Sequence, residues 1–123
     1  MSRAPHLQQG EAAEAQACRY LEQQGMQLRQ RNYRCRQGEI DLVMEHGEQL
    51  VFVEVRYRRS TRFGSGAESV DTRKQHKLVL AAQHYLQSHP KLSKRPARFD
   101  VVSMRLDGQT TKIDWIQDAF QAG

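Results

Sequence analysis

The chain has 123 residues, of which 38% are hydrophobic and 27% are charged, and its net charge is +5. This length supports one domain with a single core and excludes two. No stretch is long and apolar enough to span a membrane, and residues 1–9 lack the apolar core of a signal peptide. We therefore expect a cytoplasmic protein with no membrane partner, forming one domain over residues 1–123 that is loosely ordered at 1–8 and 118–123.

Residues 7–24 predict a first helix. Ala17 and Leu21 recur at helical spacing, and Gly25 is a suitable stop. Glu14 lies at the edge of the apolar stripe, so it points toward the boundary of the core. The plain explanation of that position is a flanking residue whose stem packs while its carboxylate reaches water.

A weak strand pattern follows at 26–34, where Asn32 favours an early end. Residues 35–38 predict a turn into two stronger strands. These are Gly-Glu-Ile-Asp-Leu-Val at 38–43 and Val-Phe-Val-Glu-Val-Arg at 51–56. Both cysteines, Cys18 and Cys35, lack the spacing of zinc ligands, and two isolated cysteines do not indicate a disulfide framework.

The two stronger strands predict a hairpin closed at residues 46–49. In this register Val43 pairs with Phe52, and Asp41 falls directly opposite Glu54. Directly opposed residues share a face of the sheet. Two carboxylates placed there repel each other unless something positive lies between them, and a divalent cation is the usual solution.

The same register divides the hairpin into two faces. The face expected to pack on a core is continuous and apolar, and consists of Ile40, Leu42, Met44, Val51, Val53 and Val55. The opposite face mixes acids with apolar neighbours and places Arg56 opposite Glu39. An ordinary surface hairpin with an ion pair is therefore the alternative interpretation.

Arginines bracket the hairpin on both sides. They are Arg29, Arg31, Arg34 and Arg36 before it and Arg56, Arg58, Arg59 and Arg62 at its end and beyond. Arginine binds phosphate in a bidentate manner and stays charged, so a polyanion held by this group would lie over the carboxylates. The alternative is a solvated basic surface that aids solubility. Residues 58–68 have the composition of a loop, which either clasps a nucleic-acid backbone or only connects its neighbours.

Ser69 or Asp71 is suited to cap a second helix that runs to about Ser88. Lys74 and Lys77, one turn apart, share a side near the start of this helix.

Residues 98–106 and 109–116 predict two further strands around the turn Asp107–Gly108, and 117–123 is expected to trail off. Asp100 either supports the acidic pair indirectly or makes structural hydrogen bonds, and the structural role is the preferred one. The order helix, three strands, helix, strand, strand predicts an α/β fold with a mixed sheet flanked by helices.

Taken together, these features resemble the restriction-endonuclease-like superfamily, which is known for its PD-(D/E)xK nuclease motif. More narrowly, the chain resembles the YraN family of small bacterial proteins, relatives of Holliday-junction resolvases. The resemblance covers residues 10–120 and rests on the segments at 38–43 and 51–56, on Lys-Gln-His-Lys-Leu at 74–78 and on Arg-Phe-Asp-Val-Val at 98–102. It implies a restriction-endonuclease-like core of order α-β-β-β-α-β-β.

The resemblance also implies a metal-dependent nuclease site. Asp41 and Glu54 match the two metal-binding acids, the Val55 carbonyl adds a ligand, and Glu14 matches the helix acid of resolvase-like members. Oxygen ligands suit Mg²⁺ or Mn²⁺. Such a metal lowers the pKa of a bound water and neutralises charge at the phosphorus centre. Glu39 is a weaker candidate for a metal ligand, because Arg56 is expected opposite it.

Arg56 departs from the motif, which usually has lysine at this position. A guanidinium stabilises a phosphate electrostatically, but it cannot act as a base. Activation of water then falls to the metal, or to Lys74 if the second helix brings it to the site.

We therefore expect an endonuclease that acts on DNA more readily than on RNA, with branched or recombination intermediates as substrates. The residues expected to contact the nucleic acid are Arg34, Arg36, Arg58, Arg59, Arg62 and Lys77. The alternatives are a nucleic-acid-binding module with little or no catalysis and a protein-interaction domain for an acidic partner. A homodimer would suit two-fold junctions.

Overall fold

The structure is a computed structural model and describes residues 5–58 and 70–122. Its elements, in chain order, are α1 Pro5–Gln23, β1 Gln27–Cys35, β2 Gly38–His46, β3 Gln49–Arg58, α2 Thr72–Ser88, β4 Ala97–Asp107 and β5 Thr110–Phe120. This order confirms the predicted α/β fold. None of the helices in these two ranges has the length and apolar character needed to cross a membrane.

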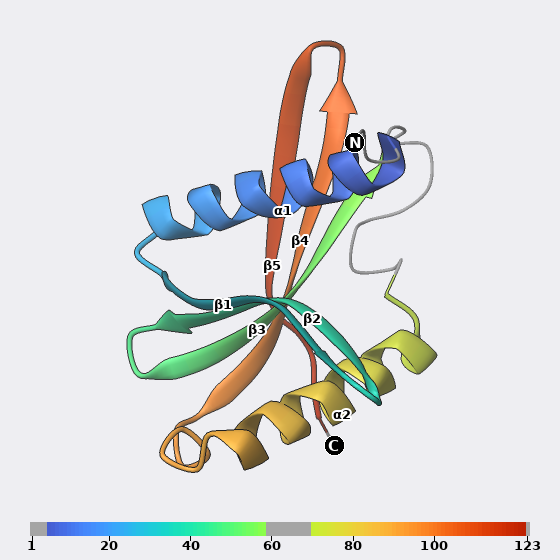
Figure 1. Cartoon of the computed structure of the whole chain (residues 1–123). Coiled ribbons are helices and arrows are strands. Elements are labelled where there is room, and N and C mark those ends of the chain that lie inside the picture. Colours follow the sequence, from blue (N-terminus) through green and yellow to red (C-terminus); the bar gives the residue numbers. More distant parts are fainter. Residues whose placement is uncertain (1–4, 59–69, 123) are drawn as a thin grey trace.

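The five strands form one mixed sheet in the order β1-β2-β3-β4-β5. β1 and β2 are antiparallel, as are β2 and β3, whereas β3 and β4 are parallel, and β4 and β5 form an antiparallel hairpin. Parallel strands need a long connection. Here the connection includes α2, which carries the chain across one face of the sheet (Figure 1).

The two helices cover opposite faces of the sheet, so the sheet has a core on each side (Figure 1). On the α1 side, Ala17 and Leu21 are fully buried against Leu42, Val53 and other strand residues. The core on the α2 side consists of Ile40, Val43, Phe52, Val70, Leu78, Ala81, Ala82, Tyr85, Phe99 and Val101. Apolar residues on both faces of β2 and β3 are therefore required.

Both helices begin or end close to the predicted residues. Gly25 follows α1 with a φ of +96°, a conformation in which a side chain is strained. The Asp71 carboxylate accepts a hydrogen bond from the Lys74 backbone N–H at 2.8 Å and caps α2. Asp71 is therefore the cap, rather than Ser69, which lies outside the described residues.

β2 and β3 pair in the predicted register, from His46–Gln49 to Leu42–Val53. The prediction that Ile40 and Leu42 share one face of the hairpin is wrong. Ile40 packs in the α2 core, whereas Leu42 packs in the α1 core. The two residues lie on either side of Asp41, so β2 changes face there. The pairing with β3 ends at Leu42–Val53, so the predicted direct pair of Asp41 with Glu54 in the β2–β3 register is not formed.

Two other strand boundaries also differ from the prediction. β1 continues past Asn32 to Cys35, because Asn32 adopts a φ of +54° within the strand instead of ending it. β5 continues past the predicted end at residue 116 to Phe120, whose ring stacks on Phe99 with centroids 4.9 Å apart. Residues 117–120, expected to trail off, thus belong to the sheet.

Candidate functional site

The site is built around two buried carboxylates, Asp41 on β2 and Glu54 on β3. Their residues are 8% and 4% exposed. The Val55 backbone N–H donates to the Asp41 carboxylate at 2.8 Å. The backbone N–H of the residue after Glu54 is therefore bonded to a side chain of β2, at the point where β2 and β3 stop pairing.

Burial disfavours the charged form of both carboxylates, and Asp41 adds to this effect at Glu54. Burial, followed by the charge of Asp41, raises the pKa of Glu54 to about 7, against the lowering effect of Lys74. Burial also raises the pKa of Asp41, although the Val55 N–H lowers it. Asp41 and Glu54 are therefore neighbours, as predicted, in an environment with little water.

Glu14 approaches Asp41 from α1. Its charge and a hydrogen bond between the two side chains both raise the pKa of Asp41. The Asn32 carboxamide lies against the other side of Glu14, and with its nitrogen facing the carboxylate it donates to both oxygens at 3.1 and 3.0 Å. Glu14 is thus part of the acidic group, and the plain interpretation of a carboxylate that only reaches water is wrong.

Glu54 is contacted by two cationic side chains. The Lys74 ammonium lies 2.6 Å from Glu54 Oε1, and the Arg56 guanidinium lies 3.8 Å from the same oxygen. Helix α2 therefore brings Lys74 to the acids, the condition on which its predicted role depended. The predicted Arg56–Glu39 contact is replaced by an ion pair of Glu39 with Arg34 at 3.2 Å.

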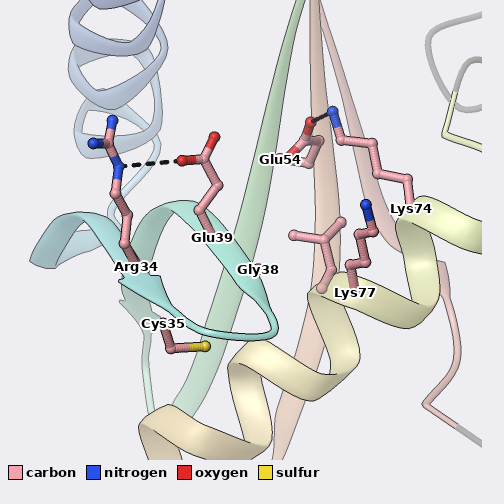
Figure 2. Close-up of a pocket in the computed structure, with 8 residues that line it drawn as sticks. Arg34, Cys35, Gly38, Glu39, Glu54, Lys74 and Lys77 are labelled. Atoms are coloured by element: carbon pink, nitrogen blue, oxygen red, sulfur yellow. Dashed lines mark ion pairs between the residues drawn. The ribbon is translucent and has the colours of Figure 1, made fainter.

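A pocket of about 330 Å³ opens beside Glu54, between the β1–β2 turn and α2 (Figure 2). Its lining consists of Arg34, Cys35, Gly38, Glu39, Glu54, Lys74, Lys77 and Leu78. Figure 2 shows Lys74 extending from α2 to Glu54, with Lys77 one turn further along the helix. A second pocket, of about 460 Å³, is lined by Asp71, Arg73, Lys74 and Lys77. The two lysines border both pockets.

The structure describes only some of the residues that are predicted to bind nucleic acid. Arg34 and Lys77 line the first pocket, and Arg36 is exposed in the turn between β1 and β2. Arg59 and Arg62 lie outside the described residues, as does the side chain of Arg58. Their roles stay predictions.

The donors present fit a hydrated Mg²⁺ or Mn²⁺ better than an all-protein cage. Asp41 and Glu54 offer carboxylate oxygens, and Mg²⁺ is commonly held by one or two carboxylates while it keeps several waters. Among the described residues, no three Asp, Glu, His or Cys side chains form a group that could hold a metal ion. Glu14 therefore does not complete a three-acid site in this arrangement.

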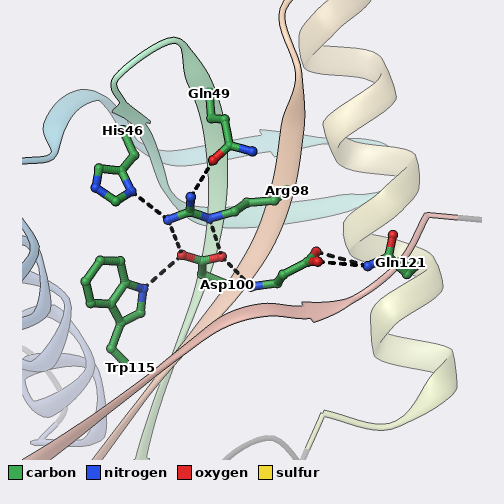
Figure 3. A network of polar contacts seen from close by, with 7 residues as sticks. His46, Gln49, Arg98, Asp100, Trp115 and Gln121 are labelled. Carbon is green, nitrogen blue, oxygen red and sulfur yellow. Dashed lines mark hydrogen bonds and ion pairs between the residues drawn. The ribbon is translucent and has the colours of Figure 1, made fainter.

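Asp100 is a buried carboxylate on the other side of the sheet (Figure 3). It accepts from Arg98 at 3.0 and 3.2 Å, from the Trp115 indole at 2.8 Å and from the Asp118 N–H at 2.9 Å. The Trp115 ring packs against Tyr20 of α1, which places this network on the α1 side. Asp100 therefore makes structural hydrogen bonds, as preferred, and does not support Glu54.

Sequence reasoning missed two residues of the site. Asn32 carries one signal, because asparagine tolerates the left-handed conformation better than most residues. Gly38 carries none, because its role is to let the β1–β2 turn approach α2. A Cβ at Gly38 would lie 3.0 Å from the Lys77 carbonyl oxygen.

Comparisons with known proteins agree on one family. Residues 13–104 match the model of "Uncharacterised protein family UPF0102". A UPF0102 protein of Nitrosococcus oceani is 50% identical over 121 residues, covering 98% of each chain. A UPF0102 protein of Xanthomonas axonopodis pv. citri is 55% identical over 119 residues, covering 97% of this chain and 96% of the relative. The chain therefore belongs to the UPF0102 family.

Proposed function

We propose that this protein is a divalent-metal-dependent endonuclease that hydrolyses phosphodiester bonds in DNA, with branched or recombination intermediates as substrates. The observation that carries the proposal is the Asp41–Glu54 pair. Two neighbouring carboxylates whose pKa values are both raised by burial are costly to a fold unless a cation neutralises them. Their resemblance to the acids of the PD-(D/E)xK motif gives that cation a role.

Asp41 and Glu54 would hold Mg²⁺ or Mn²⁺, with the Val55 carbonyl as a further oxygen donor and Glu14 next to Asp41. When bound, such a cation neutralises charge on a phosphodiester and makes water more acidic. The Val55 N–H fixes the Asp41 carboxylate by a hydrogen bond of 2.8 Å, which keeps it turned toward β3 and Glu54. The protein thus supplies a fixed acidic pair before any ligand arrives.

Arg56 and Lys74 supply positive charge beside the acids. A guanidinium is not a base in proteins, so Arg56 can stabilise a negatively charged phosphate but cannot remove a proton. Lys74 carries three donors on a flexible stem, and its ammonium already reaches Glu54. We assign Lys74 to a phosphate oxygen or to the attacking water, the place that the motif lysine usually fills.

Lys77 and the exposed Arg36 extend this positive charge from the pocket over the neighbouring surface. A DNA backbone held there would release counterions, so its binding should weaken steeply with added salt.

The test is cleavage of synthetic four-way junctions, flaps and single strands with Mg²⁺ or Mn²⁺. Wild type should cleave at least one of them, and Asp41→Asn should lower the rate on the order of a hundredfold or more, because the substitution removes a charged ligand. Asp114→Asn, at an exposed position of β5, is the matched control and should cleave as wild type does. Equal rates for wild type and Asp41→Asn would reject the proposal.

A nucleic-acid-binding module with little catalysis is the second candidate. Arg56 in place of lysine favours it, as does the lack of a three-acid group among the described residues. This candidate predicts salt-sensitive binding to DNA that needs no metal and survives Asp41→Asn, measured by fluorescence anisotropy.

A further inference from the structure

Glu54 is engaged by a cation that belongs to the protein. The Lys74 ammonium lies 2.6 Å from Glu54 Oε1, which is the distance of a strong charge-assisted hydrogen bond. The side chain of Glu54 is 5% exposed, so little water reaches that carboxylate. Arg56, at 3.8 Å, is the more distant partner. Lys74 is thus the near counter-ion of one of the two acids that would hold the metal.

The Lys74 ammonium can move away from Glu54 while the helix backbone stays in place. Its backbone is fixed, because its N–H donates to the Asp71 cap in the first turn of α2. Its side chain, by contrast, is 42% exposed and lines the two adjoining pockets. The ammonium therefore has open space next to Lys77 to move into, and no part of the helix has to shift with it.

We propose that Lys74 is a displaceable counter-cation: it neutralises Glu54 when the site holds no metal, and a divalent cation must displace its ammonium from Glu54 in order to bind. This inference rests on the proposed function, because it takes Asp41 and Glu54 as the metal-binding acids. It adds a role for Lys74 that precedes any chemistry. The lysine keeps the buried acids from remaining uncompensated, at the cost of metal affinity.

The physical reason is competition for one carboxylate. An ammonium and a divalent cation on the same carboxylate repel each other strongly in a poorly solvated place. Metal binding therefore includes the loss of the Lys74–Glu54 hydrogen bond. Removing the ammonium should then strengthen metal binding, whereas a purely catalytic lysine would leave that affinity unchanged.

The experiment measures Mg²⁺ affinity by isothermal titration calorimetry without nucleic acid, for wild type and Lys74→Met. The titration is carried out at about pH 9, above the raised pKa values of both acids, so that both are ionised. Lys74→Met should bind Mg²⁺ about tenfold more tightly than wild type, because no charge-assisted hydrogen bond has to break.

Two further variants test whether the position of the Lys74 charge matters, rather than the total positive charge of the pocket. Lys77→Met removes the same charge from the same helix and the same pocket, and should leave the affinity within about twofold of wild type because exposed charges are well screened. Lys74→Arg keeps a cation at the site, and should bind Mg²⁺ as weakly as wild type does.

A second measurement follows Lys74 in the wild-type protein itself. The ¹³Cε–¹Hε signal of Lys74, identified by its loss in Lys74→Arg, should move in wild type when Mg²⁺ is added. Should Lys74→Met bind Mg²⁺ no more tightly than wild type while Asp41→Asn abolishes binding, displacement is wrong and the proposed metal site stands. If neither wild type nor Lys74→Met binds Mg²⁺ at millimolar concentration, both the displacement and the metal site are wrong.

Discussion

The sheet buries carboxylates on both faces, and the two environments contrast sharply. On the α1 side, Asp100 is 0% exposed and is surrounded by donors from Arg98, Trp115 and the backbone of Asp118 (Figure 3). On the α2 side, Glu54 lies against a second acid and has a raised pKa. Burial is similar in the two places, but the partners differ.

This difference separates a structural carboxylate from the one that we propose binds a cation. Around Asp100 each oxygen has donors, and Arg98 is in turn held by Gln49 at 2.6 Å and by His46 at 2.9 Å. Such a closed network stabilises one conformation. Around Glu54, at the wall of a pocket, the Lys74 ammonium only partly offsets burial and the charge of Asp41, so the pKa of Glu54 stays raised.

The largest change in the free energy of unfolding is expected from Asp100→Asn. Arg98 would lose its carboxylate while its side chain is only 10% exposed. Leaving one member of a buried ion pair uncompensated should lower the free energy of unfolding by about 3 kcal/mol. Urea denaturation followed by circular dichroism measures this.

Asp114→Asn is the control for that measurement, since Asp114 is exposed on β5 and its replacement should change the free energy of unfolding little. Similar midpoints for both variants would remove the structural role assigned to Asp100.

Glu54→Gln is expected to raise the free energy of unfolding, whereas Asp100→Asn lowers it. The pKa of Glu54 is raised from 4.5 to about 7 in the folded protein. Its contribution to stability is therefore fully present below pH 4.5 and is lost as pH rises through about 7. Without metal, Glu54→Gln should be more stable than wild type by about 2 kcal/mol near pH 8 and should approach wild type near pH 4, as measured by urea denaturation at each pH.

Glu48→Gln, at an exposed position of the same hairpin, is the matched control and should follow the wild-type pH profile. A Glu54→Gln variant that is less stable than wild type at pH 8 would show that Lys74 compensates the charge fully.

The smallest effect is expected from Gly38→Ala. The new Cβ would lie 3.0 Å from the Lys77 carbonyl oxygen, a tight contact that requires the backbone of α2 at Lys77 to give by a few tenths of an ångström. We expect a loss of about 1 kcal/mol in the free energy of unfolding, together with weaker DNA binding, because the wall of the pocket moves. Gly10→Ala meets open space in α1 and should be neutral or stabilising. Equal unfolding midpoints for Gly38→Ala and wild type would place the turn farther from α2.

Local sequence patterns predicted most of the fold. The apolar pattern of β2 and β3 gave their register from His46–Gln49 to Leu42–Val53, because a shift of one residue would move every side chain to the other face. The pattern failed at Ile40, where β2 changes face, and at Phe120, which is held in β5 by stacking on Phe99. Both failures involve contacts between residues distant in the sequence.

The sequence by itself determined the element order, the acidic pair and the departure at Arg56, since these depend on residue type and on spacing along one or two strands. Only the tertiary structure decided that Lys74 meets Glu54 and that Asp100 lies on the other face. Those relations depend on how α1 and α2 pack on a twisted sheet. Side chains from separate elements meet there at distances that no local periodicity encodes.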